Sequence, residues 1–115
     1  MKLIIKRSQA AEKGLFGGHK GMKFLLSCRG ELSPEEQDLI KKYKAENELL
    51  AVFELEGSKA PHILSISALV EGRNYECKDV GNLLEVEGKI KTACENFKTL
   101  LTVMRTFGGE EVIEF

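Results

Sequence analysis

The chain has 115 residues, the length of one domain, and we expect residues 1–115 to share a single hydrophobic core. Its 43% hydrophobic and 30% charged residues exclude a largely disordered protein. The formal net charge of −1 excludes strong attraction of the whole molecule to a polyanion, and no apolar run approaches the roughly 20 residues of a membrane helix.

The first residues and the cysteines predict a cytoplasmic protein. Lys6 and Arg7 follow an apolar stretch of only three residues, which is too short for a secretory signal. The three cysteines (Cys28, Cys77 and Cys94) are far apart and form no CxxC pair, which disfavours both a disulfide framework and a zinc site. We therefore expect buried free thiols, no metal, no cofactor and no membrane partner.

Alternating apolar residues predict two neighbouring strands at residues 2–8 and 22–29, joined by a glycine-rich connector at residues 9–21 and paired antiparallel. Residues 1–30 carry seven basic side chains against one acidic, a balance of +6. Residues 31–115 carry ten basic against seventeen acidic, a balance of −7. This asymmetry indicates either an interaction face or a basic hairpin that is neutralised by acidic strands beside it.

The connector contains KGLFGGHKG (residues 13–21), which holds four of the chain's eleven glycines. Consecutive N–H groups freed by glycine can form an anion-binding concavity, and basic side chains add charge to it. The stretch matches neither the P-loop nor the GxGxxG pattern, and a strand rather than a helix follows it. Three interpretations stay open: a hairpin connector without a ligand, insertion into a protein partner through Phe16, or a site for a small anion such as a nucleotide. The residues of that anion site would be Arg7, Lys13, Gly17, Gly18, His19 and Lys20.

The basic hairpin also raises the question of a nucleic-acid partner, because Phe16 and Phe24 could stack on bases. Phe24, however, shares a strand face with Leu26 and Cys28, which predicts a core position. No RNP-type pattern is present, and the rest of the chain is acidic. We therefore do not expect a nucleic-acid partner.

A short helix is predicted next. Ser33 and Glu36 form the S-x-x-E capping-box pattern, and Pro34 takes the first helical position, where its missing N–H costs nothing. The helix should end near Lys44 and lie on the surface.

Three further strands are predicted at residues 49–55, 62–69 and 73–78. The first of them, LLAVFEL, is apolar on both faces: one face carries Leu49, Ala51, Phe53 and Leu55, and the other carries Leu50 and Val52. We expect this second face to be partly covered as well.

A long helix is predicted from Val80 or Asn82 to Phe107, with Asp79 as N-cap and Gly108 as C-terminal cap. Its apolar residues recur at steps of three and four: Leu83, Val86, Ile90, Ala93, Phe97, Leu100 and Met104. About 25 helical residues span roughly 37 Å, whereas a strand of this sheet spans only about 20–23 Å.

Because the helix is longer than the strands, we expect its C-terminal half to pack on the sheet, through Phe97, Leu100, Leu101 and Met104. For the N-terminal half, with Leu83, Val86 and Ile90, the alternatives are burial within the same chain, contact with the short helix, or a homodimer seam.

A final strand is predicted at residues 109–115 (GEEVIEF). The expected fold class is therefore α+β: a mostly antiparallel sheet of about six strands, packed by one long C-terminal helix and accompanied by one short helix. The element order is β-β-α-β-β-β-α-β.

No combination of residues predicts catalysis. The three cysteines fall on apolar faces, and neither His19 nor His62 has a partner that the sequence identifies. An enzyme is the least favoured class, and we assign no catalytic residue and no metal ligand.

The first third of the chain, from IIKRSQ through the connector to LSPEEQDLIKKYK, resembles short uncharacterised bacterial proteins, some of them carried on mobile elements. The resemblance covers residues 1–45 and implies a bacterial or phage setting, without an activity. We expect a small soluble non-enzymatic protein that acts through protein–protein contacts, forms a homodimer and modulates a host factor. Its expected interface residues are Phe16, Leu83, Val86 and Ile90. The alternative is a binder of a small anion through residues 13–21.

Overall fold

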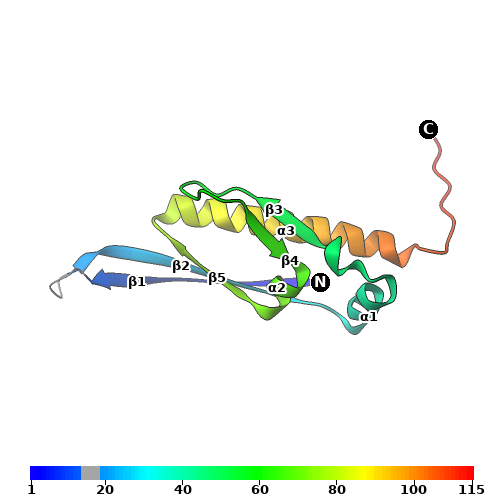
Figure 1. Ribbon diagram of the computed structural model, residues 1–115, viewed down its shortest axis with the longest axis horizontal. Coiled ribbons are helices and arrows are strands. Elements are labelled where there is room, and N and C mark those ends of the chain that lie inside the picture. Colours follow the sequence, from blue (N-terminus) through cyan, green and yellow to red (C-terminus); the bar gives the residue numbers. More distant parts are fainter. Residues whose placement is uncertain (14–18) are drawn as a thin grey trace.

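The computed structural model describes residues 1–13 and 19–115 (Figure 1). The expected α+β class is confirmed. The elements in these residues are β1 (Lys2–Lys13), β2 (His19–Glu31), α1 (Pro34–Tyr43), the 3-10 helix η1 (Ala45–Asn47), β3 (Leu50–Phe53), β4 (His62–Ser65), α2 (Ile66–Glu71), β5 (Arg73–Cys77) and α3 (Val80–Arg105). None of the described helices has the combined length and hydrophobicity that a bilayer crossing requires.

β1 and β2 form the antiparallel pair that the sequence predicted, with a register that runs from Lys2↔Glu31 to Lys13↔His19. Both strands reach further toward the connector than expected, because the backbone groups of each added residue are satisfied across the hairpin. The apolar alternation, which is the sequence signal, stops where the strands leave the core. Figure 1 shows the far end of this hairpin projecting beyond the start of α3.

The described strands form two antiparallel sheets rather than one. β5 pairs with β2 and gives a sheet of order β1-β2-β5, whereas β3 and β4 pair with each other. The rings of His62 and Tyr75 have centroids 6.4 Å apart, so β4 lies next to β5 without sharing its ladder. α3 packs against β2, β3 and β5 and runs alongside the β3–β4 hairpin (Figure 1).

The expected sixth strand is absent. Residues 109–115 form no strand, and Figure 1 shows the chain after α3 leading away from the body. Val112, Ile113 and Phe115 are exposed. The prediction was wrong because an apolar alternation makes a strand only where a neighbouring strand supplies hydrogen bonds, and none of the described strands pairs with this segment.

The predicted strand at residues 62–69 is half strand and half helix. β4 ends at Ser65, whose Oγ accepts a hydrogen bond from the Ala68 N–H at 3.0 Å and so caps α2. Ile66 and Leu69 are both buried, at the three-residue spacing of a helix. The alternation of Leu64 and Ile66 had suggested that the strand continued.

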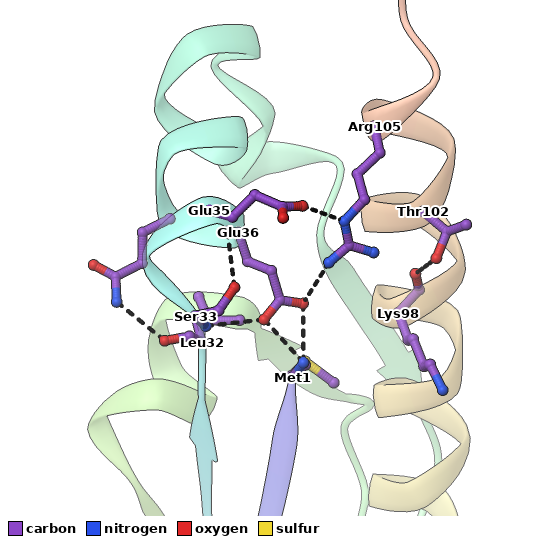
Figure 2. Close-up of polar contacts among 9 residues, drawn as sticks. Met1, Leu32, Ser33, Glu35, Glu36, Lys98, Thr102 and Arg105 are labelled. Atoms are coloured by element: carbon purple, nitrogen blue, oxygen red, sulfur yellow. Dashed lines mark hydrogen bonds and ion pairs between the residues drawn. The ribbon is translucent and has the colours of Figure 1, made fainter.

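α1 begins with the predicted capping box. Ser33 Oγ accepts a hydrogen bond from the Glu36 N–H at 3.1 Å, and Glu36 Oε1 accepts one from the Ser33 N–H at 2.9 Å (Figure 2). Lys44 ends the helix in the left-handed conformation, with φ 51°. Glu36 and Ile40 are buried, so only part of this helix lies on the surface.

α3 is one unbroken helix, and Asp79 caps it as predicted: its Oδ1 accepts a hydrogen bond from the Asn82 N–H at 2.7 Å. The apolar stripe is buried within the chain along the whole helix, through Leu83, Val86, Ile90, Ala93, Phe97, Leu101 and Met104. Leu100 is 37% exposed, so its expected place on the sheet was wrong. Gly108 has a positive φ of 87°, but the helix already ends at the C-cap Thr106.

The short helix meets the C-terminal end of α3 and not its N-terminal half. Arg105 of α3 forms an ion pair with Glu35 of α1. The ring of Tyr43 lies edge-on to that of Phe107, with centroids 4.8 Å apart. This end of the molecule is therefore closed by α1, whereas the N-terminal half of α3 packs on the strands.

Candidate functional site

Most of the predicted anion site lies outside the part of the chain that the structure describes, so this call stays a prediction. Gly17, Gly18 and Phe16 lie outside the described residues, and so do the side chains of Lys13, His19 and Lys20. Arg7 is described, and it points toward α3 rather than toward the connector. Its Nε donates a hydrogen bond to Glu87 Oε1 at 2.5 Å.

Two basic residues of the β1–β2 hairpin form ion pairs with acidic residues from later in the chain. This is the second interpretation of the charge asymmetry, in which the hairpin is neutralised within the molecule. Arg7 pairs with Glu87, and Lys23 Nζ lies 3.0 Å from Glu76 Oε1. Burial alone would raise the pKa of Glu87, but hydrogen bonds from Arg7 and Lys91 outweigh it and hold that pKa below its usual value. Glu87 is therefore ionised, and its ion pair with Arg7 links α3 to β1.

The predicted interface residues of α3 are not free to form a surface. Leu83, Val86 and Ile90 are 6%, 3% and 0% exposed. These side chains are therefore buried within one chain, which was one of the three alternatives. They could form a homodimer interface only if the hydrophobic core opened. A homodimer, if it forms, must use another surface.

The three cysteines are buried free thiols, as expected. Burial raises the pKa of Cys28 and Cys77, and it raises that of Cys94 to about 11. The reactive thiolate form is therefore suppressed at neutral pH. No group of three or more potential metal ligands occurs within residues 1–13 and 19–115.

The candidate binding surface lies on the β3–β4 hairpin. Its first strand, β3, is part of the apolar run LLAVFEL (residues 49–55). Leu49 and Leu55, which flank β3 on either side, are buried, and Ala51 and Phe53 within it are half-buried. Continuous apolar runs of this kind are typical of strands that are covered on both faces. Among the described residues, cover is found on one face of β3 and is largely missing from the other.

The uncovered face is apolar on both strands. Leu50 is 45% exposed and Val52 is 65% exposed. Val52 is paired in register with Ile63 of β4, which is 67% exposed. We call Leu50, Val52 and Ile63 the β3–β4 outer face. We expected this face to be partly covered, which holds for Leu50, whereas Val52 and Ile63 are mostly exposed.

β3 is also an edge strand, because among the described strands it pairs with β4 alone. Its second edge presents backbone N–H and C=O groups that another strand can bind. Natural edge strands are commonly blocked by lysine, proline or a bulge, and Leu50–Phe53 contains neither of those residues. Glu48 and Glu54, both exposed, stand just before and just after this strand.

Comparisons of this chain with protein-family models, with curated proteins and with solved structures find no match. The similarity of residues 1–45 to bacterial proteins therefore stays a prediction.

Proposed function

We propose that this protein is a small non-enzymatic binding protein that acts through protein–protein contact, and that the partner binds the outer face and open edge of β3–β4. One observation carries the proposal: β3 is apolar on both faces, and the described part of the chain covers one of them and leaves the other largely exposed. Leaving the other face in water is costly, since each fully buried Val, Leu or Ile side chain contributes about 1.5–3 kcal/mol.

The edge of β3 indicates how a partner would bind. An extended segment can add to an exposed edge strand through main-chain hydrogen bonds, while alternate side chains pack on the neighbouring surface. Side chains of such a segment would contact Val52 and Ile63. Because Glu48 and Glu54 flank the strand, the matching segment has apolar residues at its centre and Lys or Arg at its ends.

A second copy of the chain is one form that the partner can take, and a host protein in a bacterial setting is the other. Light scattering on the purified protein separates them, because a homodimer forms without any added component. In either case the contact residues are those of β3 and β4, and not Leu83, Val86 or Ile90.

The experiment places a photo-crosslinking amino acid at position 52 or 63, and at position 80 as control, in cells and in the purified protein. Val80 begins α3 and is 55% exposed, so it matches Val52 in chemistry and exposure but lies on another element. We expect one discrete crosslinked species from positions 52 and 63, and none from position 80.

The same species should disappear in a Val52→Lys variant, because a lysine on an edge strand blocks strand addition. A Val80→Lys variant should leave it unchanged. Both positions are exposed, so unfolding by urea should give stabilities within about 1 kcal/mol of the wild type. Equal crosslinking from all three positions, or persistence of the species in Val52→Lys, would reject the proposal.

A further inference from the structure

The sheet β1-β2-β5 has a face that α3 does not cover, and a hollow of about 360 Å³ lies on it. Leu3, Ile5, Leu26 and Cys28 turn inward, so the residues that alternate with them turn outward. The residues that line the hollow and matter for binding are Ile4, Lys6, Ser27, Arg29, Arg73 and Asn74. Arg73 is in register with Cys28 and so is not one of the outward residues; its guanidinium lies beside the Gly72 carbonyl and Glu71, which also line the hollow.

The strand register explains why these residues meet. Lys6 pairs with Ser27, and Ser27 pairs with Asn74, so the three form a row across β1, β2 and β5. Ile4 pairs with Arg29 in the row on the N-terminal side of β1. Side chains from three strands therefore converge on one place, although Lys6 and Asn74 are far apart in the sequence.

The charge of the hollow is positive. Three cations, Lys6, Arg29 and Arg73, line it against one carboxylate, Glu71. Lys6 forms no ion pair with any residue in the described part of the chain. The excess of cations in a small concave site is what an anionic ligand requires.

The two arginines are available to a ligand. Arg29 Nη1 lies 3.0 Å from Glu31 Oε1, and Arg73 Nη2 lies 3.6 Å from Glu71 Oε2. Both carboxylates are well exposed, and ion pairs at such positions contribute little to stability. Either guanidinium can therefore exchange its carboxylate for a phosphate, which it binds in the same bidentate geometry.

The neutral residues add hydrogen-bond donors. Ser27 Oγ donates to Asn74 Oδ1 at 2.7 Å, which orients the Asn74 amide and leaves its two N–H donors without a partner in the described residues. Ile4, 41% exposed, supplies an apolar contact at the side of the hollow. The combination of cations, amide donors and one apolar side chain suits a phosphate group carried by a small organic molecule.

We propose that this hollow binds the phosphate group of a small phosphorylated molecule, through Lys6, Arg29, Arg73 and the amide of Asn74. The site is separate from residues 13–21, and it includes no residue of β3 or β4. It can therefore hold whether or not the protein-binding proposal is correct.

Isothermal titration with pyrophosphate and with ATP tests the site. Lys6→Glu and Arg29→Glu should each lower the affinity by about tenfold or more, because each removes a charged hydrogen bond and adds a repulsive charge. Lys98→Glu is the matched control: it changes the net charge equally at an exposed position of α3 and should leave the affinity unchanged. Glu71→Gln should strengthen binding, and a gain of affinity cannot come from unfolding.

The outcomes are decisive in both directions. Losses with Lys6→Glu and Arg29→Glu, together with a gain with Glu71→Gln, support the site. Absence of wild-type binding to both probes at millimolar concentration overturns it. An equal loss with Lys98→Glu also overturns it, since only overall charge would then matter. Tighter binding of a short oligothymidylate than of ATP would assign the hollow to a polyanion and overturn the small-molecule ligand.

Discussion

The N-terminal ammonium group of Met1 lies 2.9 Å from Oε1 of Glu36 and 3.0 Å from its Oε2, so both carboxylate oxygens face one cation (Figure 2). The two side chains are only 4% and 2% exposed. Arg105 approaches the same carboxylate, with Nη2 at 3.5 Å from Oε2. A single buried carboxylate therefore connects the start of β1, the first turn of α1 and the end of α3.

Replacing this carboxylate should destabilise the protein. We expect Glu36→Gln to lower the free energy of unfolding by about 2–3 kcal/mol, because it leaves the Met1 ammonium group buried without a counter-charge. Glutamine keeps the size of the side chain and can still accept the hydrogen bond from Ser33, so the loss reports the charge. Unfolding by urea at neutral pH measures it.

Glu35→Gln is the control for this substitution. Glu35 is the preceding residue in the same helical turn and also pairs with Arg105, but its side chain is 64% exposed. Exposed pairs contribute about 0–1 kcal/mol, so Glu35→Gln should stay within that range. Similar losses in the two variants would contradict the role assigned to Glu36.

Stability should fall on acidification. Burial raises the pKa of Glu36, but hydrogen bonds from the N-terminal ammonium group and Ser33 outweigh it and hold that pKa below its usual value. The pKa of Glu87 is lowered as well, with Arg7 as the main partner. A carboxylate with a lowered folded-state pKa stabilises the protein fully above its unfolded-state pKa of about 4.3, and this stabilisation disappears as the pH falls through the folded-state value.

Urea midpoints measured from neutral pH down to about pH 3 test this expectation. The wild type should lose stability below about pH 5, and the Glu36→Gln/Glu87→Gln double variant should show a shallower decline. A double variant that declines as steeply as the wild type would show that other groups control acid unfolding.

Gly30 should not tolerate a side chain. A Cβ atom at this position of β2 would lie 2.9 Å from Leu69 Cγ and 3.0 Å from its Cδ2, and Leu69 is fully buried in α2. We expect Gly30→Ala to destabilise by about 1–3 kcal/mol through overpacking. Thermal or urea unfolding measures the loss.

A double variant separates overpacking from a simple change in the backbone. Leu69→Ala alone should destabilise by about 2–5 kcal/mol, and adding Gly30→Ala to it should cost little, because the clash is gone. Strictly additive losses would mean that Gly30 matters for the conformation of β2 and not for its contact with α2.

The elements that the sequence predicted well are those with a strong local signal. Ser33 and Glu36 marked the start of α1, and Asp79 marked the start of α3. The spacing from Leu83 to Met104 predicted one continuous helix with an apolar stripe. Signals of this kind act over one or two helical turns, so neighbouring residues in the chain contain them completely.

The errors occurred where a second element decides the outcome. The apolar alternation in residues 109–115 is present, but no described strand pairs with it. The alternation through Leu64 and Ile66 predicted that the strand continues, but the Ser65 hydroxyl group accepts a hydrogen bond from the Ala68 N–H and so starts α2. Leu100 fits the helical stripe by spacing, yet it lies at the border of the face that the strands cover.

The candidate sites were only partly accessible to sequence reasoning. The run LLAVFEL did indicate a strand that needs cover on both faces. Lys6, Ser27 and Asn74 carried no recognisable signal, because their proximity depends on the register of three strands. The glycine-rich connector has a conspicuous composition, but residues 14–18 lie outside the described part of the chain and the hollow does not include them.

By itself, the amino-acid sequence determined the starts of α1 and α3, the apolar stripe of α3 and the α+β class, since caps and periodicity are properties of consecutive residues. Only the tertiary structure decided that the strands divide into two sheets, that Val52 and Ile63 stay in contact with water, and that a basic hollow forms beside Asn74. The physical reason is that strand pairing joins residues that are distant along the chain, and the register of that pairing sets which side chains meet and which edge stays open.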